Sequence, residues 1–360
     1  MSKTGIYIHV PFCAKKCPYC DFYSDRFTKT TALDYTKAVI RDINAFEDKL
    51  TADTVYFGGG TPSMLPTECL SRILTALRER FDLVSPEITL EINPSTVTGQ
   101  KLTDYLSMGI NRLSFGVQSA VDSELAFLGR LHNFEKAKNA AELAKTVGFD
   151  NISCDLMLGI PYQTADSLIY SIDELCALPV THISSYMLKI EEGTPFDSED
   201  IKKLLPDEET VSEYYLKMVD MLEERGFMQY EISNFSKKGF ESRHNLKYWN
   251  CEEYAGFGPA AHSYYGGKRY FIPDDLHGFI NGRSKPVVTD DEPGQWDERI
   301  MLGLRLRKGI NVNDHPEKRE YLLKKAALFE KAGYMEINGG NISLTPKGFL
   351  LSNSIIAELI

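Results

Sequence analysis

The chain has 360 residues, of which 43% are hydrophobic and 25% are charged, enough to bury the core of one large and one small domain. Its formal net charge of −11 would repel phosphate backbones, so we expect no nucleic-acid binding. No stretch approaches the roughly eighteen consecutive apolar residues of a membrane span, and seven cysteines are an odd number for a disulfide framework. We therefore expect a cytoplasmic protein without a signal peptide or membrane anchor.

Six β-rich segments alternate with six segments that carry apolar residues at helical spacing, the pattern of βα units around a parallel sheet. The expected strands are 6–10, 54–57, 88–92, 112–117, 151–158 and 182–189. The expected helices are 33–46, 68–80, 100–108, 134–146, 165–176 and 212–224. Six units are fewer than the eight of a closed barrel. The sequence therefore predicts an α/β fold, an open, partial (β/α)6 TIM-like barrel with its site at the carboxyl ends of the strands.

Three cysteines, Cys13, Cys17 and Cys20, follow the first expected strand with the spacing C-x-x-x-C-x-x-C. Thiolates at this spacing can bind three irons of a cubic 4Fe-4S cluster and leave the fourth iron without a protein ligand. A filled structural metal site would bring a fourth Cys or His at similar spacing, and the loop that follows has neither. The sequence therefore predicts that these three cysteines bind a 4Fe-4S cluster.

Two other interpretations of this cysteine loop stay open. Cys17 and Cys20 alone form a C-x-x-C pair of the kind found in dithiol oxidoreductases, although Cys13 would crowd such a pair and the chain is long for a thioredoxin-like domain. A zinc site would need a fourth ligand, and the nearby His9 belongs to the strand before the loop. The spacing, and the position after a strand, favour the cluster.

Polar or glycine-rich residues follow the next four expected strands as well. They are the run GGGTP at 58–62, Glu91 with Asn93, the run GVQS at 116–119, and Asp155 before the run GIP at 159–161. One such feature is typical of a tight βα turn, but their position after consecutive strands indicates one binding face.

S-adenosylmethionine (SAM) fits this face and the open iron, since it is an amino acid that can bind through its amine and carboxylate. Glycines 58–60 let a ligand approach the backbone closely, and no lysine follows them as in a phosphate-binding P-loop. In this interpretation Glu91 and Asp155 accept hydrogen bonds from ribose hydroxyls or an amine, and Arg130 pairs with the carboxylate.

The chain resembles radical SAM proteins, specifically the family similar to oxygen-independent coproporphyrinogen III oxidase. The resemblance covers nearly the whole length and rests on YIHVPFC at 7–13, CPYCDF at 17–22, GGGTPS at 58–63, GVQS at 116–119, LGR at 128–130 and DLM at 155–157. It implies cluster ligands at Cys13, Cys17 and Cys20. It also implies SAM contacts at Tyr7, Tyr19, Gly59, Gly60, Thr61, Glu91, Gln118, Arg130 and Asp155.

Two departures from the oxidase point to another branch of this family. The oxidase has a further cysteine two positions after the third cluster ligand, where this chain has Phe22. The oxidase also has a segment before its first strand that helps to hold the porphyrinogen, whereas this chain is in that strand by Tyr7. Residues 243–249, RHNLKYW, contain the pattern H-N-x-x-Y-W and are similar to the HemW-type haem chaperones.

This resemblance implies a protein that binds haem and passes it to respiratory haem proteins, with a membrane surface as one place of transfer and a homodimer as one form of the protein. The alternative function is a radical SAM enzyme of porphyrin metabolism that decarboxylates coproporphyrinogen III, an activity that we do not expect here. A scaffold that depends on the cluster and has neither activity is a third interpretation.

His244 is the first candidate for a haem ligand, because a neutral imidazole is a common axial ligand of haem iron. Tyr248 and Trp249 offer flat apolar surface to the macrocycle. The alternative for His244 is a buried aromatic cluster in which hydrogen bonds satisfy the ring. His262 and Cys251 are further candidates, and His262 lies in a glycine-rich turn that could instead face the SAM pocket.

The chain changes character after residue 286, where the acidic, turn-prone run DDEPG at 290–294 marks a join. Helices are expected at 298–306, 317–332 and 348–359, with a hairpin of strands 335–337 and 342–344 around an NGGN turn. This order resembles a small winged-helix-like α+β domain, for which the acidic balance favours a lid or docking role. The expected division is a radical SAM core at 1–235, a connecting segment at 236–289 and a C-terminal domain at 290–360.

Overall fold

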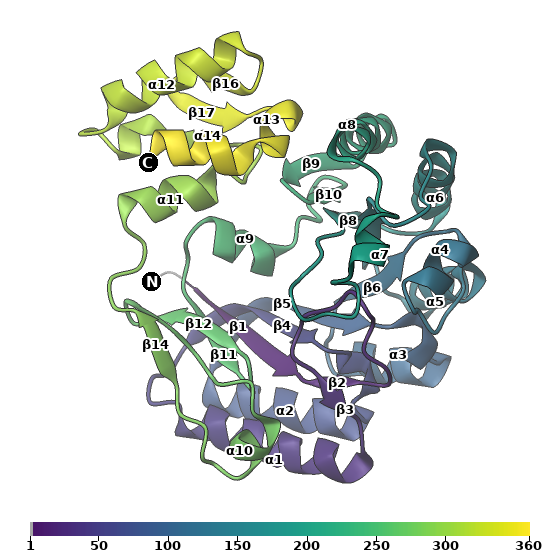
Figure 1. The fold of residues 1–360 in the computed structure, drawn as a ribbon. Coiled ribbons are helices and arrows are strands. Elements are labelled where there is room, and N and C mark those ends of the chain that lie inside the picture. Colours follow the sequence, from purple (N-terminus) through teal and green to yellow (C-terminus); the bar gives the residue numbers. More distant parts are fainter. Residues whose placement is uncertain (1–2) are drawn as a thin grey trace.

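Six parallel strands form the centre of the fold and lie side by side in chain order. The computed structural model of the protein describes residues 3–360 (Figure 1). The six strands, all of which were expected, are β1 (Thr4–Val10), β4 (Thr51–Gly59), β5 (Asp82–Ile92), β6 (Arg112–Gln118), β7 (Asn151–Leu158) and β8 (His182–Met187). Each pairs in parallel with the next.

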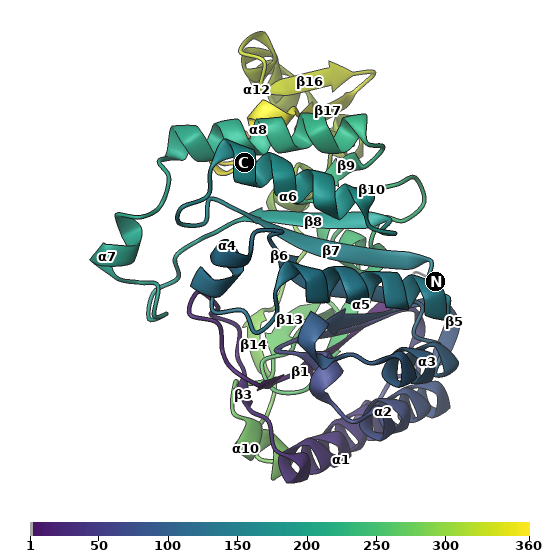
Figure 2. The ribbon, with the colours of Figure 1, turned by 90° about the vertical axis from the view of Figure 1, so that its right-hand side faces the viewer.

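A long helix follows each of these strands and packs on the outer face of the sheet (Figure 2). The helices are α1 (Lys29–Ala45), α2 (Thr67–Arg80), α3 (Gly99–Ser107), α5 (Phe134–Val147), α6 (Ala165–Ala177) and α8 (Glu208–Glu224). Five begin at a capping residue whose side-chain oxygen accepts from a backbone N–H of the first turn, which explains where they start: Thr28, Thr98, Asn133, Thr164 and Asp207.

Six further strands extend the sheet at both edges to twelve. On one side β11 (Tyr254–Phe257) pairs in parallel with β1, and β12 (His262–Tyr265), β13 (Lys268–Phe271) and β14 (Val287–Asp290) continue antiparallel. On the other side β10 (Asn234–Ser236) and β9 (Met228–Glu231) follow β8. Within residues 3–360 the edge strands β14 and β9 do not pair, so the barrel is open, as expected.

Shorter elements connect the strands and shape their carboxyl ends. β2 (Phe12–Cys13) and β3 (Asp25–Arg26) pair within the cysteine loop, and α4 (Asp122–Phe127) follows β6. The remaining short elements are η1 (Pro62–Met64), η2 (Pro94–Thr96), α7 (Glu199–Lys202), α9 (Arg243–Trp249) and α10 (Leu276–Ile280).

The strands present apolar side chains to the helices and polar side chains to the inside of the barrel. On β6, Leu113, Phe115 and Val117 are fully buried under the helices, whereas Arg112 and Ser114 face an interior cavity. Successive strand residues point to opposite faces, so a strand buried on both sides can carry a hydrophobic and a polar row. The polar rows of neighbouring strands meet inside the barrel and build the site.

The C-terminal part is a small α+β unit at one end of the molecule (Figure 1). It contains α11 (Trp296–Gly303), β15 (Ile310–Asn311), η3 (Val312–Asp314), α12 (Arg319–Lys331), β16 (Met335–Asn338), β17 (Asn341–Leu344), α13 (Pro346–Leu350) and α14 (Ser352–Leu359). The hairpin and the helices were expected, except that the last helix is two helices broken at Leu351, whose backbone is not helical.

Backbone hydrogen bonds join this unit to the edge of the barrel. The Ile232 N–H donates to the Arg305 carbonyl at 2.9 Å, and the Arg307 N–H donates to the Tyr230 carbonyl at 3.0 Å. The end of strand β9 therefore pairs antiparallel with residues 305–307 of the C-terminal unit. Among the described helices, none combines the length and the apolar character needed to cross a membrane.

Candidate functional site

The three cysteines lie in the loop between β1 and α1, at the carboxyl end of the sheet. Cys13 ends β2, and the Cys20 N–H donates to the Cys17 carbonyl at 3.1 Å, which folds the CPYC segment into a turn. All three thiols are half-buried, and all three line one cavity of about 450 Å³. In residues 3–360 no three His, Cys, Asp or Glu side chains surround a single ion position.

His9 is engaged elsewhere and does not offer a ring nitrogen to the cysteine loop. Its Nδ1 is 3.1 Å from the Tyr7 hydroxyl, and its Nε2 is 3.1 Å from the Tyr23 carbonyl. Burial lowers the pKa of His9 to about 4. A zinc site built from the three thiols and this imidazole would have to break both hydrogen bonds, so the geometry argues against that interpretation.

The strand ends bring most of the expected SAM contacts to the same cavity. Besides the cysteines it is lined by Tyr19, Gly59, Gly60, Thr61, Glu91, Gln118, Arg130 and Asp155. On β6 the lining residues are Arg112, Ser114, Gly116 and Gln118, every second residue of the strand. The cavity therefore runs along the strands, from the cysteine loop at their carboxyl ends to Arg112 and His182 at their first residues.

Two half-buried residues, Glu91 and Asp155, contribute carboxylic acids to this cavity. Burial raises the pKa of Glu91 to about 7, opposed by the Tyr56 hydroxyl, which donates to its Oε1 at 2.8 Å. Burial also raises the pKa of Asp155 to about 6, opposed by the charges of Arg130 and Arg112. Near neutral pH these groups lie close to their protonation midpoints, so bound cations and donors will change their charge.

Arg112, which the sequence analysis did not select, is a buried cation on the cavity floor. Only 2% of the residue is exposed, and its Nε makes no hydrogen bond. Arg112 lowers the pKa values of Glu87, Glu91 and Asp155 through its charge and not through a direct hydrogen bond. The sequence signal for Arg112 is strand alternation, because every second residue of a strand lies on the same face. Arg112 shares that face with Ser114, Gly116 and Gln118.

The glycines of the GGG run are required by neighbouring protein atoms. A Cβ on Gly59, whose φ is +105°, would lie 2.7 Å from the His9 ring. A Cβ on Gly60 would lie 2.8 Å from the Phe12 carbonyl. Packing against the first strand and its loop is thus sufficient to explain the run, although Gly59 and Gly60 also line the cavity.

Tyr7 and His244 lie outside the residues that line this cavity and contact each other in an aromatic cluster. The His244 ring stacks on Tyr56, with centroids 5.2 Å apart, and on Tyr7 at 6.4 Å. Its Nδ1 is 2.8 Å from the Thr54 hydroxyl, and its Nε2 is 2.8 Å from the Tyr248 hydroxyl. Only 1% of His244 is exposed, and burial lowers its pKa to about 3. This geometry matches the alternative of a hydrogen-bonded aromatic cluster.

The two further haem-ligand candidates also lie outside the cavity lining. His262 is exposed at the start of β12 and stacks on Phe271, with ring centroids 5.4 Å apart. Cys251 is buried after α9. Burial raises the pKa of its thiol, as expected for a small core residue and not for a reactive thiolate.

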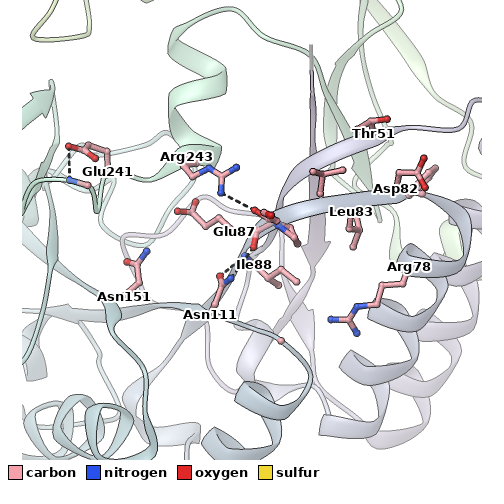
Figure 3. A pocket seen from close by; sticks show the side chains of 16 residues that line it. Thr51, Arg78, Asp82, Leu83, Glu87, Ile88, Asn111, Asn151, Glu241 and Arg243 are labelled. Atoms are coloured by element: carbon pink, nitrogen blue, oxygen red, sulfur yellow. Dashed lines mark hydrogen bonds between the residues drawn. The ribbon is translucent and has the colours of Figure 1, made fainter. Parts of the chain in front are cut away.

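A second cavity of about 970 Å³ lies at the opposite, amino end of the strands (Figure 3). Arg243 and Asn111, two of its polar residues, hydrogen-bond to neighbouring parts of the chain. Arg243 donates to the Ser85 carbonyl and pairs with Asp53, both at 3.1 Å, and Asn111 bonds the backbone on either side of Glu87. Because active sites of such barrels lie at the carboxyl ends of strands, we take the cysteine-lined cavity as the candidate site.

Two protein-family models match parts of the chain. The model of the Radical SAM superfamily matches residues 7–175, and that of the HemN C-terminal domain matches residues 291–351. The heme chaperone HemW of Haemophilus influenzae is 37% identical, with 98% of this chain and 96% of the relative aligned. HemW of Bacillus subtilis is 35% identical over 98% of both chains, and HemW of Lactococcus lactis is 32% identical over 98% and 96%.

A solved structure shares the fold. Coproporphyrinogen III oxidase (HemN) from Escherichia coli, described as a radical SAM enzyme, superposes with a TM-score of 0.82 over 99% of this chain and 90% of the oxidase. At 20% sequence identity this likeness shows a shared fold and nothing closer. The near-complete coverage of relatives above 30% identity decides the family: the chain belongs to the HemW family of radical SAM proteins.

Proposed function

We propose that this protein is a haem chaperone that binds haem and delivers it to respiratory haem proteins, and that it carries a 4Fe-4S cluster and SAM. The observation that carries the proposal is the joint position of three half-buried cysteines at a cavity lined by polar side chains. The name of the curated relatives, heme chaperone HemW, supports haem as the ligand.

The donor set at the cysteine loop fits a 4Fe-4S cluster. Cys13, Cys17 and Cys20 would each bind a different iron, which is consistent with thiols that do not converge on one ion position. Arg130 places its Nη1 3.7 Å from the Cys17 sulfur and would stabilise a thiolate there. When bound, a reduced cluster supplies an electron that can cleave the SAM sulfonium.

The cavity fits SAM in size and chemistry. A volume of about 450 Å³ lies in the range of small-molecule pockets. We assign Glu91 and Asp155 as acceptors for ribose hydroxyls or an amine. We assign Tyr19, Gly59, Gly60, Thr61, Gln118 and Arg130 as the other contacts. Gln118 is held for this role by the Tyr186 hydroxyl, which donates to its Oε1 at 3.0 Å.

The remaining parts of the proposal concern partners and organisation. We place the protein in the cytoplasm, with respiratory haem proteins as acceptors, some of them at a membrane surface, and with a homodimer as one form. We also keep the division into a core at 1–235, a connecting segment at 236–289 and a C-terminal domain at 290–360. The main-chain contacts of β9 with residues 305–307 suit a C-terminal domain that docks on the barrel edge.

A radical SAM enzyme of porphyrin metabolism is the second candidate, because the whole chain shares the fold of coproporphyrinogen III oxidase. An enzyme of this kind would release 5'-deoxyadenosine and a decarboxylated porphyrinogen. Against it stands Phe22, which lines the cavity at the position where the oxidase carries a further cysteine.

One experiment separates the two candidates. The protein is reconstituted anaerobically with iron and sulfide and divided into two samples. One sample is loaded with haem and mixed with a haem-free b-type cytochrome, and the other receives SAM, a reductant and coproporphyrinogen III. We expect haem to appear in the cytochrome and the porphyrinogen to remain intact. Catalytic formation of protoporphyrinogen would overturn the chaperone assignment in favour of the enzyme.

A further inference from the structure

Two large apolar side chains are exposed where the cysteine-lined cavity opens. Phe22 is 64% exposed in the loop just after Cys20, and Met187 is 37% exposed at the last residue of β8. Both line the same cavity as the three cysteines. Single exposed apolar residues are common on protein surfaces, but two that line one cavity offer apolar contacts to a ligand that docks there.

Two lysines without acidic partners lie at the same opening. Lys15 and Lys16 are exposed between Cys13 and Cys17, and both line the cavity. Within residues 3–360 neither forms an ion pair. Lys189, which also lines the cavity, is by contrast paired with Glu191 at 2.7 Å. Two cationic groups are thus available to an anionic ligand beside an exposed aromatic ring.

The chemistry of this opening matches haem. Haem combines a flat apolar macrocycle, two propionates on one edge and an iron that takes a thioether as axial ligand in some haem proteins. We propose that haem docks at this opening, with its macrocycle on Phe22, its propionates on Lys15 and Lys16, and its iron on the Met187 sulfur. This inference rests on the proposed function and names the site that haem occupies.

The surroundings of His244 favour this location over the H-N-x-x-Y-W segment. Both ring nitrogens of His244 are hydrogen-bonded at 2.8 Å, and the residue is 1% exposed. Ligation by His244 would require both bonds to break and the stack on Tyr56 to open. Met187 is by contrast an exposed residue that lines the cavity, and no hydrogen bond or aromatic stack has to open for a ligand to reach it.

Haem at this opening would also cover the route to the cavity beneath it. Phe22 and Met187 come from opposite ends of the row of six parallel strands, the loop after β1 and the end of β8. A ligand that contacts both would span the opening of the cavity. SAM already bound in the cavity should therefore exchange more slowly once haem is bound, and this should depend on Phe22.

The axial ligand is tested with Met187→Leu and a matched control. Met228→Leu is the control, because Met228 is 54% exposed on β9 and does not line the cavity. Ferric haem is titrated into the reconstituted protein under argon, and the sulfur-to-iron charge-transfer absorption is recorded. We expect this absorption in the parent and in Met228→Leu and its loss in Met187→Leu, with binding weakened roughly tenfold. Retention of this absorption in Met187→Leu would refute the ligand assignment.

The propionate contacts are tested with the double variant Lys15→Glu, Lys16→Glu. The control is Lys217→Glu, Lys324→Glu, which changes the net charge equally at exposed helical positions away from the cavity. Each is titrated with haem and with haem dimethyl ester, which has no free propionates. We expect the Lys15, Lys16 variant to bind haem about tenfold more weakly and the ester as the parent does.

The outcomes separate this inference from the proposed function. Haem binding by the parent that is unchanged in Phe22→Ser, Met187→Leu and the Lys15, Lys16 variant would overturn the inference and leave the chaperone function standing. If His262→Ala loses haem while these three variants bind it normally, the inference would also be overturned. The haem site would then lie at β12, and the chaperone function would stand. Absence of haem binding in the reconstituted parent would overturn the proposed function itself. All the substituted side chains are exposed, so thermal unfolding should be unchanged.

Discussion

The guanidinium of Arg130 joins the cysteine loop to the end of strand β6. Its Nη1 donates towards the Cys17 sulfur at 3.7 Å, and its Nη2 donates to the Gly116 carbonyl at 2.5 Å. A guanidinium presents two separate donor nitrogens in a rigid fork, whereas a lysine would have to reach both groups from one ammonium nitrogen. Arg130 therefore fixes the loop over the cavity and sets a positive charge beside one thiol.

The first prediction concerns this contact. Arg130→Lys keeps the charge but loses the two-directional geometry, and Arg130→Met loses both. Because charge-assisted hydrogen bonds contribute about 1.5–3 kcal/mol, we expect SAM binding to weaken roughly tenfold or more in Arg130→Met and by less in Arg130→Lys. Isothermal titration with SAM under argon measures this, and equal affinities in all three proteins would contradict the assigned role.

The second prediction concerns the cluster ligands. Cys17→Ser removes one of three thiolates, so a second iron loses its protein ligand and the cluster should degrade. We expect reconstituted Cys17→Ser to lose the brown colour and most of its iron and sulfide. Cys176→Ser is the control, because this half-buried thiol lies on α6, outside the cavity lining. Full iron content in Cys17→Ser would show that the ligands are assigned wrongly.

The third prediction concerns stability and pH. Burial raises the pKa of Glu91 from 4.5 to about 7, so the folded protein holds this proton more tightly than the unfolded chain does. The resulting stabilisation is present below about pH 4.5 and is lost as the pH rises to about 7. Between pH 4.5 and 7 we expect the Tm of the parent to fall. Glu91→Gln lacks this titrating group, so its Tm should fall by several degrees less. Parallel Tm curves would contradict the assignment.

The fourth prediction concerns Arg112. Its positive charge lowers the pKa values of Glu91 and Asp155 and so keeps more of both groups ionised near neutral pH. In Arg112→Gln both pKa values should rise, and the pH at which SAM binding is half-maximal should move upward, whereas Arg112→Lys should keep it near the parent value. Affinities measured from pH 5.5 to 8.5, as a test range around these pKa values, check this. An unchanged midpoint in Arg112→Gln would contradict the role of its charge.

The fifth prediction concerns the aromatic cluster around His244. His244→Leu leaves the Thr54 and Tyr248 hydroxyls without their partner inside the protein. Unsatisfied buried groups cost about 1–3 kcal/mol each, so we expect a clear loss of unfolding free energy by urea denaturation. His262→Leu, at an exposed position, should have little effect. Equal stability of both variants would contradict the structural role of His244.

The sequence predicted the six central strands because each is a local pattern of β-rich residues followed by a segment with apolar residues at helical spacing. It did not predict β11, since Tyr254–Phe257 pairs in parallel with the distant strand β1, and no local pattern reports such a pairing. The sequence placed Glu91, near the end of β5, and Gln118, at the end of β6, on one face. Both line the same cavity. This was possible because carboxyl ends of parallel strands meet at one edge.

The limits of the sequence appear at His244 and Arg112. A histidine in a helical segment looks the same whether its ring faces a ligand or a hydroxyl, and only the fold brings Thr54 to its Nδ1. Arg112 begins a strand, where a charged residue is usually exposed, and only the extension of the cavity along β6 makes it a buried cation. In both cases partners distant in sequence decide the environment.

The central claim, that this member of the HemW family binds haem in a defined ratio, is tested most directly by a haem titration of the anaerobically reconstituted protein. Absorption is followed to saturation, and the bound haem is measured after gel filtration. We predict about one haem per chain that remains bound through the column. An absorption change that grows linearly without saturation, with haem lost on the column, would contradict the account.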